Sequence, residues 1–225
     1  MIFINNENKN NENINLTLSR LQKVNREGMD KLINYLKNDT DYFTAPASTK
    51  FHGNFKGGLI EHCNNVVNLL YEKNKRYNLN ILDESIIICG LLHDICKCNF
   101  YEKSVKWAKE NNQWKAFLGF AINDTLPLGH GAKSVIILQD FIKLTDLEKH
   151  LIMWHMYSHD LSEYNKYTLN KAVELYPAIV AFYTADLEAS TFLEEKVDLL
   201  EISQEEANKI QNEKREREQI KGIYE

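Results

Sequence analysis

The chain has 225 residues, 44% of them hydrophobic and 26% charged, a composition typical of one sizeable globular domain with or without appendages. Its net charge of −5 and isoelectric point of about 5.8 argue against broad, sequence-independent binding to a phosphate backbone. No apolar run approaches the roughly 18 residues needed to cross a bilayer, and MIFINNENKN lacks the basic start and apolar centre of a signal peptide. We therefore expect a cytoplasmic protein whose four cysteines are reduced thiols.

Residues 1–45 are predicted to form an N-terminal segment with one amphipathic helix. The first fifteen residues are rich in asparagine, and we expect them to be frayed or to form a short edge element. Apolar residues then recur at positions i, i+3, i+4 and i+7 from Met29, which is the spacing of a helix with one apolar stripe. A long loop rich in glycine and small polar residues follows, and its length favours a functional role.

Two apolar helices are predicted next, and both carry ionisable side chains. The first begins near Leu59, and His62 lies on its apolar face. The second contains SIIICGLL and implies burial on most sides, with Asp83 as its expected N-cap and His93–Asp94 near its end. Burying such a pair costs several kcal/mol unless a partner compensates for the lost hydration.

Residues 99–124 interrupt the helical pattern. Two aromatic-rich segments flank the sequence ENN, which predicts a β-hairpin. Helices then resume. One of them opens at His130, and the next is predicted to start with a capping box of Thr145 and Glu148 and to carry His155 on its apolar side.

The C-terminal part is predicted to be helical on both sides of Pro177, which would start or kink the second half. Asp186 shares a face of that half with Ile179 and Phe182. Residues 198–225 are highly charged and are expected to form a solvated helix or a disordered tail.

Several ionisable side chains thus lie on apolar faces of different predicted helices. A single buried histidine is usually a core residue with a hydrogen bond, but a whole set must find partners together, and a metal ion is the simplest shared one. Imidazole and carboxylate ligands suit Mn²⁺, Fe²⁺, Co²⁺, Ni²⁺ or Zn²⁺ better than a calcium cage, and Mg²⁺ is kept as an alternative. The set is His62, His93, Asp94, His130, His155 and Asp186.

These segments resemble a known family. LIEHCNNV, GLLHDICK and ADLEA are similar to the H…HD…D pattern of the HD superfamily of metal-dependent phosphohydrolases, over roughly Phe51 to Ala189. FHGNFKGGLIEH is also similar to the HHAYxGGLLEHT run of the bacterial 3′–5′ exoribonucleases in that superfamily. The resemblance implies an all-α HD-domain helical bundle over residues 46–197, with the hairpin as a small insertion.

The resemblance also implies a mononuclear or dinuclear metal centre in which Asp94 bridges the two ions when both are present. Cys96 departs from the pattern, because many members have glycine there, and we expect it to alter local packing more than the chemistry. The implied ligands are His62, His93, Asp94 and Asp186 for one ion, with His130 and His155 added for the second.

The implied reaction is hydrolysis of a phosphoester or phosphoanhydride of a nucleotide, with a hydroxide held by the metal as the nucleophile. Asp94 would fix the metal, and Lys97, one turn after His93, would hold a substrate phosphate as a point charge, unless it is simply an exposed lysine at a helix end. His52 and Lys50 would reach the phosphate or the leaving group, or else are ordinary loop residues.

Aromatic side chains of the hairpin, among them Tyr101 and Trp107, are candidates for a lid on which a base stacks, a contact worth ~1–3 kcal/mol. Packing of one strand face against the helical core explains the same residues more plainly. His159 is expected in a loop near the site.

The leading hypothesis is an enzyme for a small nucleotide, with no membrane partner and no binding to long duplexes. An alternative is a 3′–5′ exonuclease or cyclic-nucleotide phosphodiesterase acting on short nucleic acids, although the expected oligonucleotide-binding β-barrel has no matching run of strands before residue 50. A further alternative is a catalytically inactive nucleotide-binding HD module, against which the complete ligand set argues. A di-iron oxygenase would require more carboxylates than the sequence offers.

Overall fold

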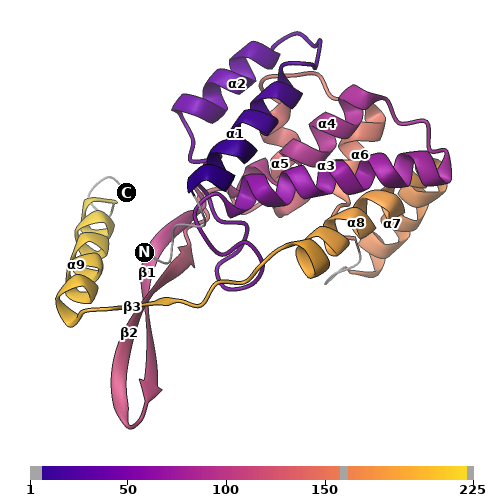
Figure 1. Cartoon of the computed structure of the whole chain (residues 1–225). Coiled ribbons are helices and arrows are strands. Elements are labelled where there is room, and N and C mark those ends of the chain that lie inside the picture. Colours follow the sequence, from indigo (N-terminus) through magenta and orange to yellow (C-terminus); the bar gives the residue numbers. More distant parts are fainter. Residues whose placement is uncertain (1–6, 158–161, 222–225) are drawn as a thin grey trace.

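The computed structural model describes the protein over residues 7–157 and 162–221. Most helices form one body, a long β-hairpin leaves that body, and the last helix lies beside the hairpin (Figure 1). The expected helical architecture with a small hairpin insertion is confirmed. The helices are α1 (Glu7–Leu21), α2 (Met29–Asn38), α3 (Gly58–Tyr77), α4 (Asp83–Leu92), α5 (His130–Gln139), α6 (Asp146–Met153), α7 (Glu163–Leu175), α8 (Ala178–Glu188) and α9 (Gln204–Lys221), with a 3₁₀ turn η1 (Ile95–Lys97) and a π-helical turn η2 (Ala189–Leu193).

Helix α3 runs through the middle of the helical body and packs against α4 and α8. Its buried face includes Leu59, Cys63 and Val67, and α4 is buried over most of its length, as the isoleucine run predicts. Gly90 allows the close approach of these two helices, because a Cβ at this position would lie 2.5 Å from Val67 Cγ2 and 3.0 Å from Val67 Cα. This contact sets the distance between α3 and the C-terminal end of α4, where His93 lies.

The asparagine-rich N-terminus differs from the expectation. From Glu7 onward it is the helix α1, so the prediction of a frayed or edge segment is wrong there, and residues 1–6 lie outside the described ranges. The reason is tertiary: Arg20 Nη1 donates to Asn64 Oδ1 on α3 at 2.6 Å, and Lys9 pairs with Glu61 at 2.9 Å. Helices gain most of their stability from such packing, which intrinsic propensity does not reveal.

The predicted helix starts have different outcomes. The capping box is present, with Thr145 accepting from the Glu148 amide and Glu148 accepting from the Thr145 amide. Pro177 occupies the N-cap of α8, so it starts the second half of that region. Asp83 is not the N-cap. Leu82 holds that position in an extended conformation, and Asp83 is the first helical residue, where its negative charge interacts favourably with the positive end of the helix dipole.

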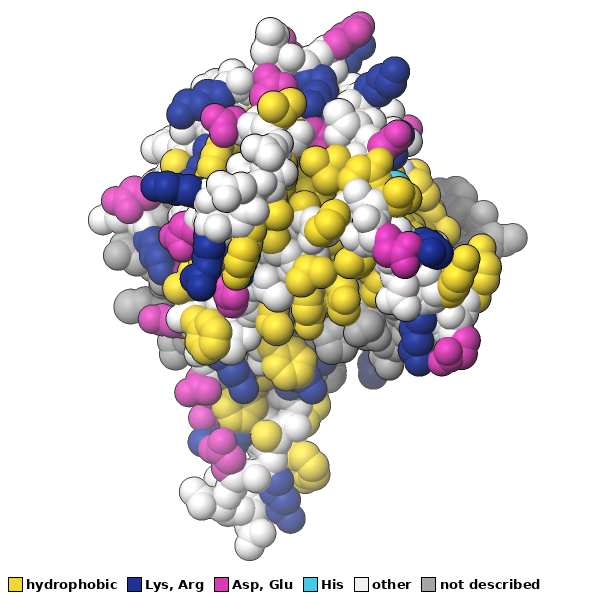
Figure 2. All heavy atoms as spheres, turned by 90° about the vertical axis from the view of Figure 1, so that its right-hand side faces the viewer, with side chains coloured by type: hydrophobic (Ala, Val, Ile, Leu, Met, Phe, Trp, Pro, Cys, Tyr) yellow, Lys and Arg dark blue, Asp and Glu magenta, His cyan; other side chains and the backbone are white. Residues whose placement is uncertain are grey.

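The hairpin pairs β1 (Tyr101–Glu110) with β2 (Gln113–Ile122) in antiparallel register around a two-residue turn of Asn111 and Asn112. Both asparagines have positive φ, as this tight turn requires. A short third strand, β3 (Leu200–Ile202), pairs with β2, and Ala207 of α9 is buried in a small core beside it. Figure 2 shows the hairpin as a narrow projection below the helical body, and hydrophobic side chains gather in the middle of that body's face.

None of the helices within the described ranges is long and apolar enough to span a lipid bilayer.

A buried carboxylate joins three parts of the helical body. Glu148 is fully buried, and its Oε2 accepts from Arg26 Nη1 at 2.6 Å and from the Thr145 amide at 2.8 Å. Its Oε1 accepts from Ser85 Oγ of α4 at 2.8 Å. Burial alone would raise the pKa of Glu148, but the hydrogen bonds from Arg26, Thr145 and Ser85 lower it below its usual value.

We expect Glu148→Ala to lower the free energy of unfolding by about 3 kcal/mol, because it leaves Arg26 and the cap of α6 without their shared acceptor. Urea unfolding followed by circular dichroism in the presence of a chelator measures this. Glu174→Ala, which removes the exposed pair with Lys171, serves as the control and should cost less than about 1 kcal/mol. Equal unfolding midpoints for the two variants would contradict the prediction.

Candidate metal centre

Three histidines turn their Nε2 atoms toward one region of the interior, because the Nδ1 atom of each ring is held by a hydrogen bond on the other side. His62 Nδ1 lies 2.9 Å from Glu194 Oε1, His93 Nδ1 lies 3.0 Å from the Gly90 carbonyl, and His155 Nδ1 lies 2.7 Å from the Ile152 carbonyl. Each of these partners is an oxygen acceptor, so Nδ1 carries the proton in every case. The Nε2 atoms are thereby left to face inward, which is the orientation that a metal-binding histidine adopts.

The inward nitrogens meet one another and a carboxylate. His62 Nε2 lies 3.2 Å from His93 Nε2 and 3.1 Å from Asp186 Oδ1, and His93 Nε2 lies 3.5 Å from Asp94 Oδ2. Donor atoms that share one ion at 2.0–2.2 Å lie about 3–3.5 Å apart. Two imidazole lone pairs at such a distance repel each other unless a cation lies between them, so the donor set fits a metal ion.

A proton competes for the same place. Burial would lower the pKa of His62, but the carboxylates of Glu194 and Asp186 raise it to about 10. Burial lowers the pKa of His93 to about 4. His62 therefore holds a proton when no metal is bound, and metal binding must displace that proton.

The charges around these histidines favour a divalent cation. Burial would raise the pKa of Asp94, but Lys97, whose Nζ lies 2.6 Å from Asp94 Oδ2, and His93 hold it well below its usual range. Burial would likewise raise the pKa of Asp186, but its hydrogen bond with the His62 ring lowers it. Once His62 has lost its proton, the carboxylates of Asp94, Asp186 and Glu194 face one ammonium group among the described residues, that of Lys97, so this set then has two negative charges in excess.

A second group of donor atoms lies on the other side of Asp94. Asp94 Oδ1 is 3.6 Å from His155 Nε2 and 4.0 Å from Cys96 Sγ, and Cys96 Sγ is 3.3 Å from His130 Nδ1. His155 Nε2 is buried and has no hydrogen-bond partner among the described residues. The two oxygens of Asp94 therefore face different donor atoms, and His155 links the two sides because it also belongs to a donor group with His93 and Asp186.

The structure brings most of the predicted site residues together. The six residues predicted as ligands belong to overlapping groups whose donor atoms lie within 4.8 Å of one another. A cavity of about 160 Å³ is lined by three of them, Asp94, His155 and Asp186, and by Lys97 and His52. Burial and the neighbouring His62 lower the pKa of His52. The other residues that line the cavity are Met156, Tyr183, Leu187 and Ser190.

The three other predicted substrate contacts do not line this cavity, although the Tyr101 hydroxyl lies close enough to Lys97 and Asp94 for their charges to act on its pKa. The Lys50 ammonium lies over the ring of Phe51, 5.2 Å from its centroid, and Tyr101 donates its hydroxyl hydrogen to the Ala47 carbonyl at 3.2 Å. Trp107 is six residues further along β1 than Tyr101, about 20 Å at the usual rise per residue, so the hairpin carries it away from the helical body. His159 lies outside the described residues.

Glu194 is a site residue that the sequence analysis missed. It follows η2 in an extended segment without periodicity, and acidic residues in such segments are usually solvated. Here its side chain is 1% exposed because residues 194–199, the C-terminal strap, are tied to the glycine-rich loop. Asn54 exchanges two hydrogen bonds with the Val197 backbone, and the Gly53 amide donates to the Glu195 carbonyl.

A comparison with family models decides the relationship of the chain. The model described as HD domain matches residues 59–218, well over half of the sequence. The chain belongs to the HD domain family. HD domains are generally metal-dependent hydrolases that bind divalent cations, and the His/Asp clusters of this HD domain are able to hold such an ion. No curated protein and no solved structure matches the chain significantly.

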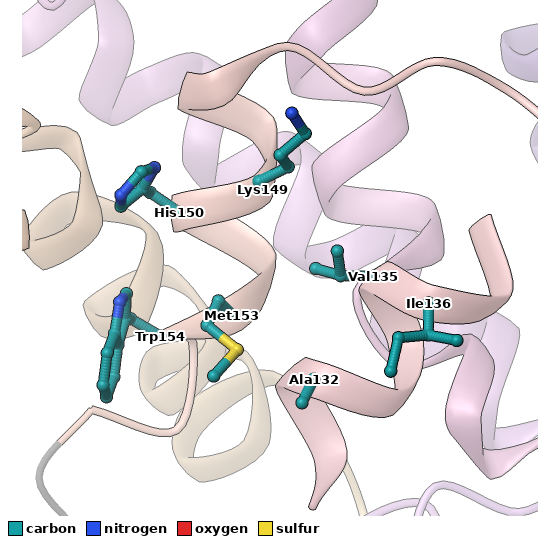
Figure 3. A pocket seen from close by; sticks show the side chains of 7 residues that line it. All are labelled: Ala132, Val135, Ile136, Lys149, His150, Met153 and Trp154. Carbon is teal, nitrogen blue, oxygen red and sulfur yellow. The ribbon is translucent and has the colours of Figure 1, made fainter. Parts of the chain in front are cut away.

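A second hollow in this HD domain has a different character. It lies between α5 and α6, with a volume of about 270 Å³, and its lining is mostly apolar (Figure 3). Ile136 of α5 faces Met153 of α6 across it, while Lys149 and His150 stand at its margin. No group of ionisable donors converges there within the described part of the chain, so the metal centre is assigned to the smaller cavity beside Asp94.

We expect Glu194→Gln to raise the dissociation constant for Co²⁺ or Zn²⁺ about 10–100-fold, because it weakens the acceptor that orients His62. Isothermal titration of the metal-free protein, with a competing chelator, measures this. Glu195→Gln is a matched control, since the Glu195 side chain is exposed and only its backbone carbonyl is used. Identical affinities for the two variants would show that Glu194 does not orient the ligand.

Proposed function

We propose that this HD domain is a phosphohydrolase that cleaves a phosphoester or phosphoanhydride bond of a nucleotide. The observation that carries the proposal is the approach of His62 Nε2 and His93 Nε2 to 3.2 Å beside Asp186. The proposed ligands of one divalent transition metal ion (Mn²⁺, Fe²⁺, Co²⁺, Ni²⁺ or Zn²⁺) are His62, His93, Asp94 and Asp186, with His130 and His155 available to a second.

A divalent ion held here supplies Lewis acidity: it polarises a phosphoryl oxygen and lowers the pKa of a coordinated water. Asp94 is positioned to contact the donor atoms on both of its sides, because Oδ2 faces His93 and Oδ1 faces His155. Lys97 lines the cavity, and its ammonium, held against Asp94 Oδ2, offers its remaining hydrogens to a substrate phosphate. His52, which also lines the cavity, offers a ring nitrogen to a substrate oxygen.

The size of the cavity supports a substrate that inserts only its phosphate. Pockets that enclose a whole drug-sized ligand have volumes of about 300–1,000 Å³, whereas this one measures about 160 Å³. A nucleotide would therefore place its phosphate beside Asp94 and Lys97 and leave its base at the mouth, near Met156 and Tyr183. The acidic chain supports a small substrate over a long nucleic acid.

The test is a hydrolysis screen on chelator-treated protein that is reloaded separately with Mn²⁺, Co²⁺, Ni²⁺ and Zn²⁺. Generic phosphomonoester and phosphodiester substrates and a library of nucleotides are assayed by release of phosphate or nucleoside. We expect Asp94→Asn to lower kcat/KM by more than the about 100-fold typical of mutations in outer-shell partners, because it removes a ligand itself.

Asp140→Asn, at the exposed C-cap of α5, is the matched control and should retain activity. Nucleotide binding without turnover for any of the metals would overturn the proposed function and favour a nucleotide-binding module. Turnover that survives Asp94→Asn would place the reaction elsewhere.

A further inference from the structure

The donor cluster on the Oδ1 side of Asp94 contains a thiol. Cys96 lies in the turn η1, two residues after Asp94, and its side chain is buried with 1% of its surface exposed. Its Sγ atom lies 3.3 Å from His130 Nδ1 and 4.0 Å from Asp94 Oδ1. Around one four-coordinate ion with a Zn–S bond near 2.3 Å, donor atoms lie about 3.4–3.6 Å apart, so these separations need shifts of only a few tenths of an ångström.

His155, whose donor atom is grouped with those of His93 and Asp186, gives an independent indication that a ligand lies beside Asp94 Oδ1. Its ring is 0% exposed and its Nδ1 is satisfied by the Ile152 carbonyl, whereas its Nε2, 3.6 Å from Asp94 Oδ1, has no hydrogen-bond partner within the described ranges. A buried polar atom without a partner costs about 1–3 kcal/mol. The protein maintains this nitrogen in an interior position that faces a carboxylate oxygen, where a cation would satisfy both.

The backbone holds these donors in place. Gly131, next to His130, allows α5 to approach the end of α6, because a Cβ there would lie 2.1 Å from the Met153 carbonyl oxygen. The Cys96 amide donates to Ser134 Oγ on α5, which fixes η1 against that helix. His130, Cys96 and the segment that carries His155 are thus positioned by contacts that do not involve the cluster itself.

We propose that Cys96 is a ligand of a second metal position, with Asp94, His130 and His155, and that its thiolate makes this position select Zn²⁺ or Co²⁺ over Mn²⁺ and Mg²⁺. The inference extends the proposed metal centre and rests on it. Thiolate donors favour the softer ions, whereas a site of imidazole and carboxylate alone accepts the harder ones. Binding converts the thiol to a thiolate, and its proton leaves to solvent.

The two proposed metal positions share Asp94 but differ in the donor atoms that they offer. The position of His62, His93 and Asp186 has only nitrogen and oxygen donors, while the position of Cys96 has sulfur as well. A glycine at 96, as in many relatives that the sequence resembles, would leave the second position with three donors. Residue 96 is therefore a determinant of metal specificity in this chain.

The test uses the optical spectrum of Co²⁺, which reports sulfur ligation without any assay of activity. Metal-free full-length protein is titrated with Co²⁺ while bound metal is counted by elemental analysis. We expect two ions per chain and a sulfur-to-cobalt charge-transfer band in the near ultraviolet. Cys96→Ser should lose this band, and Cys98→Ser, at a half-buried thiol outside the cluster, should keep it.

The second measurement is metal selectivity. In Cys96→Gly, whose folding is checked by circular dichroism, the preference of the second position for Zn²⁺ over Mn²⁺ should fall by at least about 10-fold. Cobalt bound by the wild type without the sulfur band, or a band that persists in Cys96→Ser, would overturn this inference and leave the metal centre standing. Failure of the wild-type protein to bind Co²⁺ at all would overturn the proposed centre itself.

Discussion

Two imidazole nitrogens held 3.2 Å apart in a buried site are the constraint on which the rest of this structure depends. Hydrogen bonds at Nδ1 fix both rings so that Nε2 of His62 and Nε2 of His93 face each other. Such an approach is unfavourable without a positive charge between the rings. The surrounding carboxylates, the lysine beside Asp94 and His155 Nε2, which has no hydrogen-bond partner among the described residues, all belong to one electrostatic system centred on that charge.

The helical scaffold can be understood as the means of maintaining this approach. Gly90 lets α3 and α4 come close enough for His62 and His93 to meet, and α8 brings Asp186 to the same point. Phe182, one turn before Asp186, packs edge-on against the His93 ring and limits its rotation. The apolar faces thus position the ligands as well as forming the core, which explains why ionisable residues recur on them.

Much of this could be predicted from the sequence, for a specific reason. His62, His93 and Asp186 interrupt apolar periodicity, and a polar residue on a buried face must have a partner, so their positions indicate a shared site. The hairpin can likewise be predicted from its local sequence pattern. Which other elements pack against the hairpin cannot be predicted in this way. We expected its aromatic face against the helical core, whereas α9 packs on part of it and β3 extends the sheet beside β2, so residues far apart in the chain are joined there.

The residues that escaped prediction depend on tertiary contacts. The sequence around Glu194 has no apolar periodicity that would predict burial. Its side chain is buried because hydrogen bonds of the strap to Asn54 and Gly53 hold the strap against the glycine-rich loop. Helix α1 is specified by its contacts with α3 rather than by its composition. Cys96 is visible in the sequence as a departure from the family pattern, but its closeness to His130 is a property of the fold.

The bond between His62 and Glu194 joins residues that are 132 positions apart. Packing of α3 against α8 closes almost the same loop, so the strap adds only a short further segment once these two helices have met. The helices are thus able to assemble before the acceptor that orients His62 arrives. Maturation of the site is therefore coupled to docking of the strap, and a metal ion captured early would meet an incompletely oriented ligand.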